Sequence, residues 1–235
     1  ILTDRTNGLA VKTLRLSVVN DRLRAFGVVS GAPLDDCPPL LREAELRREL
    51  WVLVERMLGS AQASAKEDRD GLARLPVVLG TDGLVWSPAD VYRADDETLS
   101  LFANLGVELP LLAVDPDFHQ LSQLSPALSV EAVVVSLEQA PPWADGAALG
   151  AACDRTKLLE WFASRRTSIE RRDDLKARIA ALPLFPAGDG FSPLAQLSLP
   201  GAFEDPLGVA EVVDVVKVRA LVPFLEDLGA RTLSL

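Results

Sequence analysis

The chain has 235 residues, enough for one large domain or two small ones, and either can bury a core. Hydrophobic residues at 49% and charged residues at 25% are typical of a folded soluble protein and exclude a disordered tail. The net charge of −10 opposes binding to phosphate backbones, and no apolar run is long enough to span a bilayer. We therefore expect neither a nucleic-acid partner nor a membrane partner. Two cysteines, Cys37 and Cys153, offer no disulfide framework or metal spacing and favour a cytoplasmic location.

The sequence begins at Ile1 and not at Met, which we interpret as a piece of a longer protein, although a processed N-terminus would look the same. Alternating apolar and polar residues over 13–18 predict a half-buried strand. With a turn at Asn20-Asp21, residues 12–30 are expected to form a β-hairpin. Residues 1–35 are therefore interpreted as a β lead-in that continues an upstream domain.

A strong amphipathic pattern follows the prolines that end this lead-in. Residues 40–58 are expected to form a helix, and residues 59–70 a polar loop. The apolar face of that helix carries Leu41, Leu46, Leu50, Leu53, Val54 and Met57. Apolar, β-prone residues then flank Gly80-Thr81-Asp82-Gly83, which predicts a hairpin because Asp-Gly tolerates the positive φ of tight turns.

Further helices are expected on each side of a junction at residues 139–146. Asp95-Asp96-Glu97 is an acidic helix start, and Gly106 is the expected stop of that helix. A strand at 109–114 and a helix at 129–139 complete the first half. The second half opens with a helix that carries Trp161, which we expect to be buried with Leu158, Leu159 and Phe162.

One phrase of the sequence occurs twice. Leu75-Pro76, followed by Asp82-Gly83, returns as Leu182-Pro183 followed by Asp189-Gly190, each shifted by 107 positions (75 to 182 and 82 to 189). This distance suggests duplicated modules of ordinary domain size. We predict an α+β fold of two related helix–β-hairpin–helix modules, with an N-terminal β-hairpin. Residues 36–140 would form module one and residues 141–235 module two.

Chemistry-bearing motifs are sparse. His119 is the single histidine, and with Asp115 and Asp117 it could hold a metal or begin an acid–base site. The other interpretation is a short surface helix that begins after Asp115-Pro116-Asp117. The sequence has no phosphate-binding loop and no nucleophile elbow. We therefore assign no catalytic residue, no metal ligand and no cofactor, and we expect that the segment is not an enzyme.

The repeated phrase is similar to a known module. The amphipathic Leu-rich helix, the charged stretch and Leu182-Pro183-Leu184-Phe185-Pro186 before Asp189-Gly190 resemble the internal repeat regions of sacsin and its large bacterial relatives. In that family an Hsp90-like ATPase domain lies elsewhere in the chain. The resemblance implies a non-catalytic, chaperone-like scaffold segment that contacts client or partner proteins or other domains of its own chain. The alternative is a small hydrolase or metal-dependent enzyme centred on Asp115, Asp117 and His119.

Overall fold

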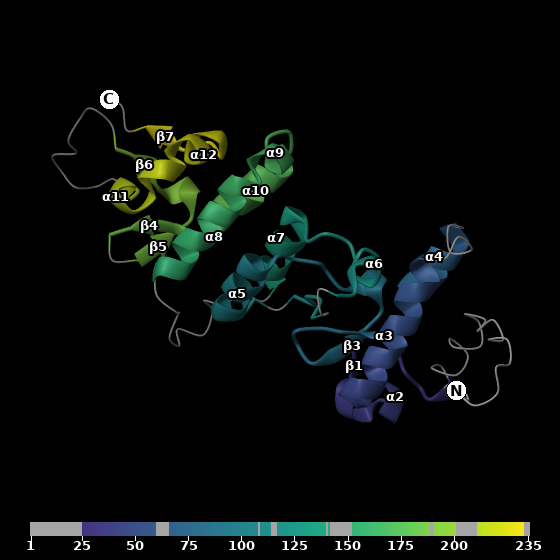
Figure 1. The fold of residues 1–235 in the computed structure, drawn as a ribbon. Helices are drawn as coiled ribbons and strands as arrows, with labels where there is room; N and C mark the ends of the chain where they lie inside the picture. The colour runs from purple at the N-terminus through teal and green to yellow at the C-terminus, as the bar shows by residue number, and fades with distance from the viewer. Residues whose placement is uncertain are drawn as a thin grey trace, which may run out of the picture. The chain divides into compact units, whose positions relative to one another are not determined.

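The computed structural model describes residues 25–59, 66–107, 109–113, 117–139, 141, 152–188, 190–200 and 211–232. Over these residues the fold is α+β, as predicted, with short strands among many helices (Figure 1). The chain divides into two compact units. Unit 1 comprises residues 1–94 and 110–127, and unit 2 comprises residues 95–109 and 128–235.

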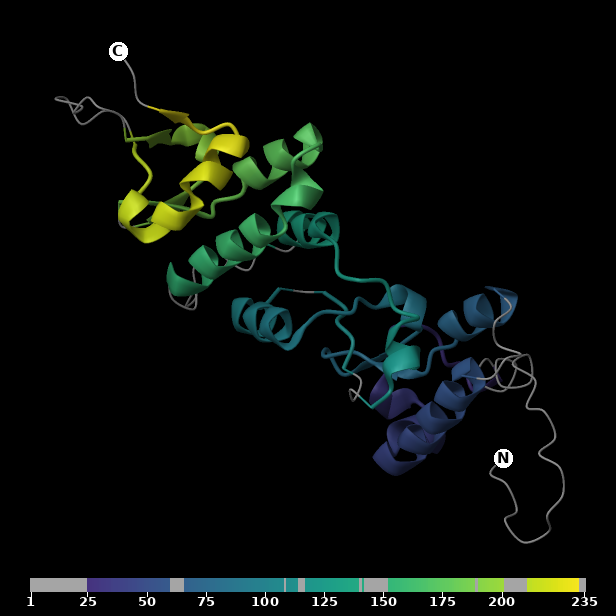
Figure 2. The same cartoon turned by 45° about the horizontal axis from the view of Figure 1, so that its top comes forward.

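Unit 1 combines helices with a three-stranded antiparallel sheet. Its helices are α2 (Pro39–Arg42), α3 (Ala44–Gly59), α4 (Lys66–Ala73) and α6 (His119–Ser122). Its strands are β1 (Ala32–Pro33), β2 (Val78–Leu79) and β3 (Leu84–Trp86), and its 3-10 helices are η1 (Leu34–Asp36) and η3 (Pro88–Asp90). Strand β3 lies between β1 and β2, and α6 packs on α3 (Figure 2).

The hairpin predicted over residues 12–30 is wrong in the part that the structure describes. Residues 25–31 contain no strand, and the strand that joins the sheet is β1, in a segment predicted to interrupt the structure. Gly27 and Gly31 have φ values of 72° and 85°, in the left-handed region that a strand does not use. Pro33 is tolerated because β1 is an edge strand. The first part of the predicted hairpin, residues 12–24, lies outside the described residues.

The predicted helix at 40–58 is confirmed, with one break. Glu43 has an extended backbone, with φ of −78° and ψ of 124°, and separates α2 from α3. The predicted loop at 59–70 is wrong from Lys66 onward, where α4 begins. Its polar sequence is compatible with a solvated helix because Lys, Glu and Arg are good helix formers.

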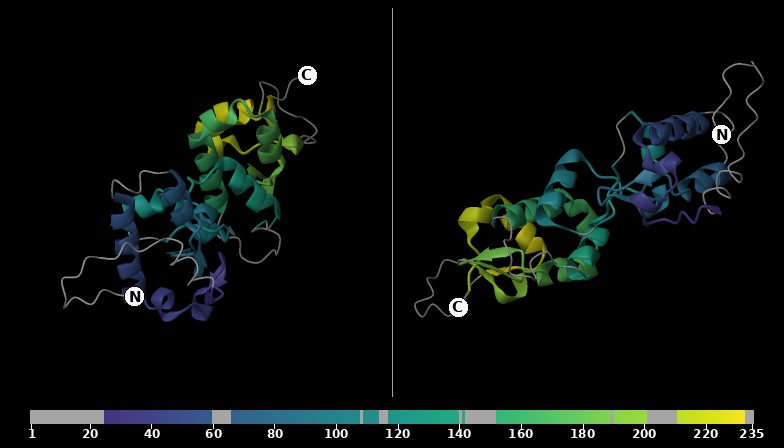
Figure 3. Two further views of the ribbon diagram at one scale, coloured as in Figure 1. Left: turned by 90° about the vertical axis from the view of Figure 1, so that its right-hand side faces the viewer. Right: turned by 90° about the horizontal axis from the view of Figure 1, so that it is seen from below.

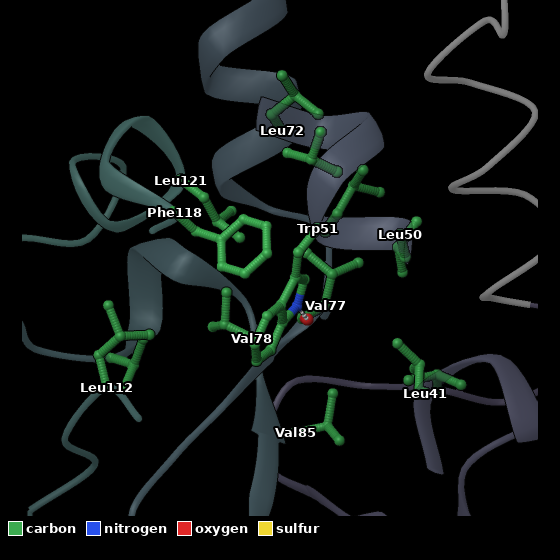
Figure 4. Close-up of a cluster of buried hydrophobic side chains, with 14 of the residues drawn as sticks. Leu41, Leu50, Trp51, Leu72, Val77, Val78, Val85, Leu112, Phe118 and Leu121 are labelled. Atoms are coloured by element: carbon green, nitrogen blue, oxygen red, sulfur yellow. Dashed lines mark hydrogen bonds between the residues drawn. The ribbon is translucent and has the colours of Figure 1, made fainter. Parts of the chain in front are cut away.

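The core of unit 1 forms where α3 lies over the β2–β3 hairpin. Trp51 of α3 points its indole nitrogen at the Val77 carbonyl oxygen, to which it donates a hydrogen bond of 2.6 Å (Figure 4). Its ring meets Phe118 edge to face, with centroids 5.4 Å apart. The buried cluster also includes Leu41, Leu50, Val54, Leu58, Leu72, Val78, Val85, Leu112 and Leu121. The predicted face of α3 is thus buried at Leu50 and Val54.

In its described residues, unit 2 combines helices with two two-stranded sheets (Figure 3). Its helices are α5 (Asp96–Leu105), α7 (Val130–Gln139), α8 (Ala152–Ser164), α9 (Arg166–Ile169), α10 (Asp173–Ala181), α11 (Val215–Val218) and α12 (Val222–Asp227). Its strands are β4 (Phe185–Ala187), β5 (Gly190–Ser192), β6 (Ser198–Leu199) and β7 (Arg231–Thr232), and its 3-10 helices are η4 (Leu194–Gln196) and η5 (Arg219–Leu221). Strands β4 and β5 pair antiparallel, whereas β6 and β7 pair parallel.

The predicted limits of α5 are confirmed by its capping groups. The Asp95 side chain accepts a 2.7 Å hydrogen bond from the Thr98 backbone N–H, which satisfies one free donor of the first turn. Gly106 ends the helix with φ of 65°. Helix α7 is also confirmed and begins one residue after the predicted Ser129.

The two repeated hairpins differ in register by one residue. In the first, the Gly80 N–H donates to the Leu84 carbonyl oxygen at 2.9 Å, and the three residues between them form the loop. In the second, Ala187 pairs with Gly190, so the loop has only two positions, 188 and 189. The prediction of an Asp-Gly tip is correct for Gly83 and wrong for Gly190, which lies in β5. Asp189 itself lies outside the described residues.

A second extended segment completes the hairpin of unit 1. The Tyr92 N–H donates to the Pro110 carbonyl oxygen at 2.8 Å, and the Leu112 N–H donates to the Tyr92 carbonyl oxygen at 2.9 Å. The Ala113 N–H then donates to the Leu79 carbonyl oxygen at 2.8 Å. Residues 110–113 therefore bridge β2 and the segment after η3.

Unit 2 repeats this pattern of hydrogen bonds. The Ser198 N–H donates to the Glu211 carbonyl oxygen at 3.0 Å, and the Val213 N–H donates to the Ser198 carbonyl oxygen at 3.0 Å. The Asp214 N–H donates to the Pro186 carbonyl oxygen at 2.9 Å. Each bond corresponds to one in unit 1, in the same chain order. The shared pattern supports a duplication of the unit, which stays a prediction.

The chain passes between the two units three times. Residues 95–109 leave unit 1, contribute α5 to unit 2 and return to unit 1 at residue 110. Residue 128 then begins the second passage into unit 2. The compact units are therefore not continuous in sequence, and the modules predicted for residues 36–140 and 141–235 stay a prediction.

The hairpin geometry generates a matched test. We expect Gly83→Ala to lower the free energy of unfolding by about 1–2 kcal/mol, because Gly83 has a φ of 78° that a side chain disfavours. Gly190→Ala is the control, because Gly190 lies in β5 outside the left-handed region, and an added Cβ there meets nothing within 4 Å. Urea denaturation followed by circular dichroism measures both variants. Equal losses of unfolding free energy in Gly83→Ala and Gly190→Ala would contradict the difference between the two hairpin loops.

Candidate functional site

The structure places the predicted acid–base residues on the surface of unit 1. Asp117 is exposed and lies 3.2 Å from the Arg48 guanidinium of α3. His119 is the exposed first residue of α6, and its carbonyl oxygen accepts a 2.7 Å hydrogen bond from the Ser122 hydroxyl. Asp115 lies outside the described residues. In the part of the chain that the structure describes, no cluster of three His, Cys, Asp or Glu side chains could hold a metal ion.

The start of α6 is fixed by a residue that the sequence did not single out. Glu55 of α3 accepts hydrogen bonds from the backbone N–H groups of Gln120 and Leu121, both 2.8 Å long. Arg48 also lies over the Phe118 ring, 5.4 Å from its centroid. The polar groups around His119 therefore dock α6 on α3. Glu55 and Gln120 are 65 positions apart in the sequence, so this role of Glu55 is visible only in the folded structure.

One concave surface of unit 2 lies between α5 and α8. It has a volume of about 370 Å³. Its lining residues are Asp95, Glu97, Thr98, Leu101, Asn104, Lys157, Glu160, Trp161, Ser164 and Arg165. This α5–α8 groove has acidic and basic groups at its rim and apolar side chains at its base. None of the lining residues is a histidine or a cysteine.

Trp161 holds α5 on α8 beneath this groove. Its side chain is only 6% exposed, and its indole N–H donates a 3.0 Å hydrogen bond to the Thr98 hydroxyl. Phe102 and Phe162 both contact the indole edge to face, with centroid separations of 5.4 and 5.3 Å. Leu158, Leu159 and Phe162 are fully buried. The prediction of a buried Trp161 is confirmed, and Trp161 is a packing residue.

Arg165 covers the indole from outside. Its guanidinium lies 3.9 Å from the Trp161 ring centroid and donates hydrogen bonds to the Trp161 carbonyl oxygen and the Ser164 hydroxyl. Burial lowers the pKa of Arg165, and Asp95 and Glu97 act in the opposite direction. The guanidinium stays protonated, so it remains a partly desolvated cation. The Asp95 carboxylate lies 3.7 Å from the Arg165 guanidinium.

Asp95 acts mainly as the cap of α5. Hydrogen bonds from the backbone and side chain of Thr98 lower the pKa of the Asp95 carboxyl, and Arg165 adds a smaller effect in the same direction. Asp95 and Arg165, two of the charged groups that line the α5–α8 groove, therefore have structural partners. The Thr98 hydroxyl accepts a hydrogen bond from the Trp161 indole and also bonds to Asp95, so it takes part in the packing of α5 on α8.

Helix α7 is attached to α10 by ion pairs. Arg178 binds the Glu138 carboxylate through two hydrogen bonds of 2.9 and 2.6 Å. Arg172 contacts Glu131 at 3.0 Å and Asp174 at 2.9 Å. Hydrogen bonds from these arginines lower the pKa of both glutamates. Such exposed pairs contribute little stability individually, but they define how α7 lies along α10.

The repeated Leu-Pro phrase is anchored by one helix residue in each unit. In unit 2, Arg155 of α8 is 7% exposed and donates a 2.9 Å hydrogen bond to the Pro183 carbonyl oxygen. Its guanidinium also lies 4.6 Å from the centroid of the Phe191 ring. Burial lowers the pKa of Arg155. In unit 1 the corresponding donor is Trp51, which bonds to Val77. Sequence reasoning missed Arg155 because it stands in a polar run.

The remaining predicted residues have simple environments. Cys37 is buried, and its thiol lies 3.4 Å from the Pro33 carbonyl oxygen. Burial raises the pKa of this thiol, which lowers its reactivity. Cys153 lies in α8, and its side chain is outside the described residues, as is Trp143. No helix in the described residues is long and apolar enough to cross a membrane.

The role of Trp161 can be tested by graded substitution. We expect Trp161→Ala to lower the free energy of unfolding by about 3–5 kcal/mol, because it removes a large buried side chain. Trp161→Phe keeps much of the ring and should lose less, including about 1 kcal/mol for the hydrogen bond to Thr98. Urea denaturation measures both. A loss near zero for Trp161→Ala would indicate a ligand platform in place of a packing residue.

The cap of α5 should make stability depend on pH. The folded-state pKa of Asp95 is lowered, so its contribution is present above the unfolded pKa and is lost as the pH falls through the folded pKa. We expect Asp95→Asn, which keeps a capping oxygen, to reduce the decline in melting temperature below about pH 5. Asp96→Asn, one residue beyond the cap, is the control. A decline as steep in Asp95→Asn as in the wild type would contradict this assignment.

Comparison with known proteins adds no identification. No protein-family model matches the chain, and neither do the curated proteins or the solved structures. The resemblance to sacsin-like repeats therefore stays a prediction.

Proposed function

We propose that the chain is a non-catalytic scaffold segment of a larger, chaperone-like multi-module protein. It would bind partner or client proteins, or other domains of the same polypeptide, in the cytoplasm. The segment itself would use neither a metal ion nor a nucleotide. An ATPase domain elsewhere in the parent protein would supply any energy-dependent step.

We base this proposal on the use of the charged groups. Nine described residues of unit 2 have shifted pKa values, and six of them show how these charges hold structural elements in place. They are Asp95 and Asp214, which cap helices, Glu131 and Glu138, which hold α7 on α10, and Arg155 and Arg165, which cover aromatic rings. In an enzyme, shifted groups are expected to converge on a cleft that substrate can enter. Of the shifted groups in unit 2, Asp95 and Arg165 do line the α5–α8 groove, but each also fixes structure there, Asp95 as the cap of α5 and Arg165 over the Trp161 ring. This structural use of the charges favours a scaffold.

Two further features support binding to proteins. The repeated hydrogen-bond pattern agrees with a tandem architecture, in which stacked units commonly form extended binding surfaces. Large apolar side chains are also exposed at Phe26 (65%) and Val29 (64%), whereas exposed Val216 (89%) has no second exposed large apolar residue near it in the described sequence. Phe26 and Val29 lie within one turn-rich segment of unit 1, so they offer a local apolar contact point.

A light-scattering assay tests the proposal directly. The full chain is mixed with a heat-sensitive test protein, and scattering is followed during heating below the melting temperature of the chain. We expect wild-type chain to reduce scattering, and Phe26→Ser/Val29→Ser to do so less, because the apolar contact point is lost. Val216→Ser is the matched control in unit 2. No reduction of scattering by the wild type would contradict the client-binding role.

Calorimetry tests the non-catalytic part of the proposal. Titration of the chain with Mg-ATP, and separately with Zn²⁺, should give no heat of binding. Saturable nucleotide binding with turnover would overturn the proposal. So would metal binding that His119→Ala abolishes, because it would support an enzyme centred on Asp115, Asp117 and His119.

A further inference from the structure

Helices α3 and α8 occupy equivalent places in the two units. Each donates one buried side chain to a carbonyl oxygen of the repeated phrase, Trp51 to Val77 and Arg155 to Pro183, one position earlier in the phrase. Three and seven positions after these donors, each helix has a buried apolar residue. These are Val54 and Leu58 in α3, and Leu158 and Phe162 in α8. The equivalence therefore fixes which faces of the two helices correspond.

One flank of α8 is covered by α5. Trp161, six positions after the anchoring Arg155, contacts Thr98 and Phe102 of α5. Lys157, two positions after Arg155, lines the α5–α8 groove. Lys157 and Trp161 are four positions apart, so both lie on the same side of α8. This flank is therefore the surface that α8 uses to bind α5.

The same flank of α3 carries apolar residues that are only partly buried. Leu53 and Met57 are two and six positions after Trp51, and they correspond to Lys157 and Trp161. Leu46 lies on the same side, seven positions before Leu53. All three were expected in the core, but each remains partly exposed to solvent. Among the described residues, the principal partners of α3 are α2 and α6, and neither corresponds to α5.

We propose that Leu46, Leu53 and Met57 of α3 form a docking surface for an α5-type helix of another copy of this unit. Such a helix presents an apolar face like that of Leu101, Phe102 and Leu105 in α5, which are buried in unit 2. This inference deepens the proposed function, on which it rests, by naming the partner. Units would then associate in series, each receiving one helix on the flank of its first long helix.

A binding titration tests the docking surface. The probe is a fluorescein-labelled peptide of residues 94–107, which contains α5 and its capping residues, added to the full chain and followed by fluorescence anisotropy. We expect saturable binding that Leu53→Asp/Met57→Asp weakens by about tenfold or more, because a carboxylate is then placed against apolar side chains. Val52→Asp is the control, because Val52 lies on the neighbouring exposed face of α3.

A crosslinking experiment needs no variant of the chain and so is independent of folding defects. The peptide carries a photoreactive phenylalanine at the position of Phe102, and mass spectrometry locates the adduct. Crosslinks to residues 46–57 support the proposal. No saturable binding, equal binding by Leu53→Asp/Met57→Asp, or crosslinks confined to α8 would overturn it. The light-scattering assay tests client binding without the α5 peptide. A failure of the docking proposal can therefore be distinguished from a failure of the proposed function.

Discussion

The fold depends on how very short strands satisfy their backbone groups. A strand of two or three residues can form few ladder bonds, and buried carbonyl groups without partners are costly. Each unit meets this constraint in two ways. A helix side chain donates to the Leu-Pro phrase, and an extended segment far along the chain bonds to the hairpin. The helices, the hairpin and the later segment are thereby joined into one core.

Local signals in the sequence predicted the local structure. Asp95 and Gly106 limit α5 because capping depends on residues within one turn of the helix end. The burial of Trp161 followed from the helical period of its apolar neighbours. The helix at Lys66 was missed because it begins in a polar run, and the β1 strand was missed because Pro33 and the pair Pro38-Pro39 indicated a break.

The candidate site was harder to predict because its contacts are distant in sequence. Glu55 docks α6 across 65 positions, and Trp161 meets Thr98 across 63. Hydrophobic period identifies which face of a helix is buried, but it does not say which partner covers it. For the same reason, Leu53 and Met57 of α3 were assigned to the core along with Val54. The hairpin register also escaped prediction, because the same Asp-Gly pair of the sequence accompanies two hairpins with loops of different length.

The passage of residues 95–109 through unit 2 has a consequence for synthesis. Helix α5 leaves the ribosome before α8, the helix that covers it, so its apolar face lacks its final partner while about fifty further residues are made. Unit 1 meanwhile needs residues 110–113 to complete its bridge to β2. Neither unit can therefore reach its final fold in strict N-to-C order. A ribosome that pauses between residues 105 and 152 would hold an intermediate with Leu101, Phe102 and Leu105 uncovered by α8, a natural substrate for a holding chaperone.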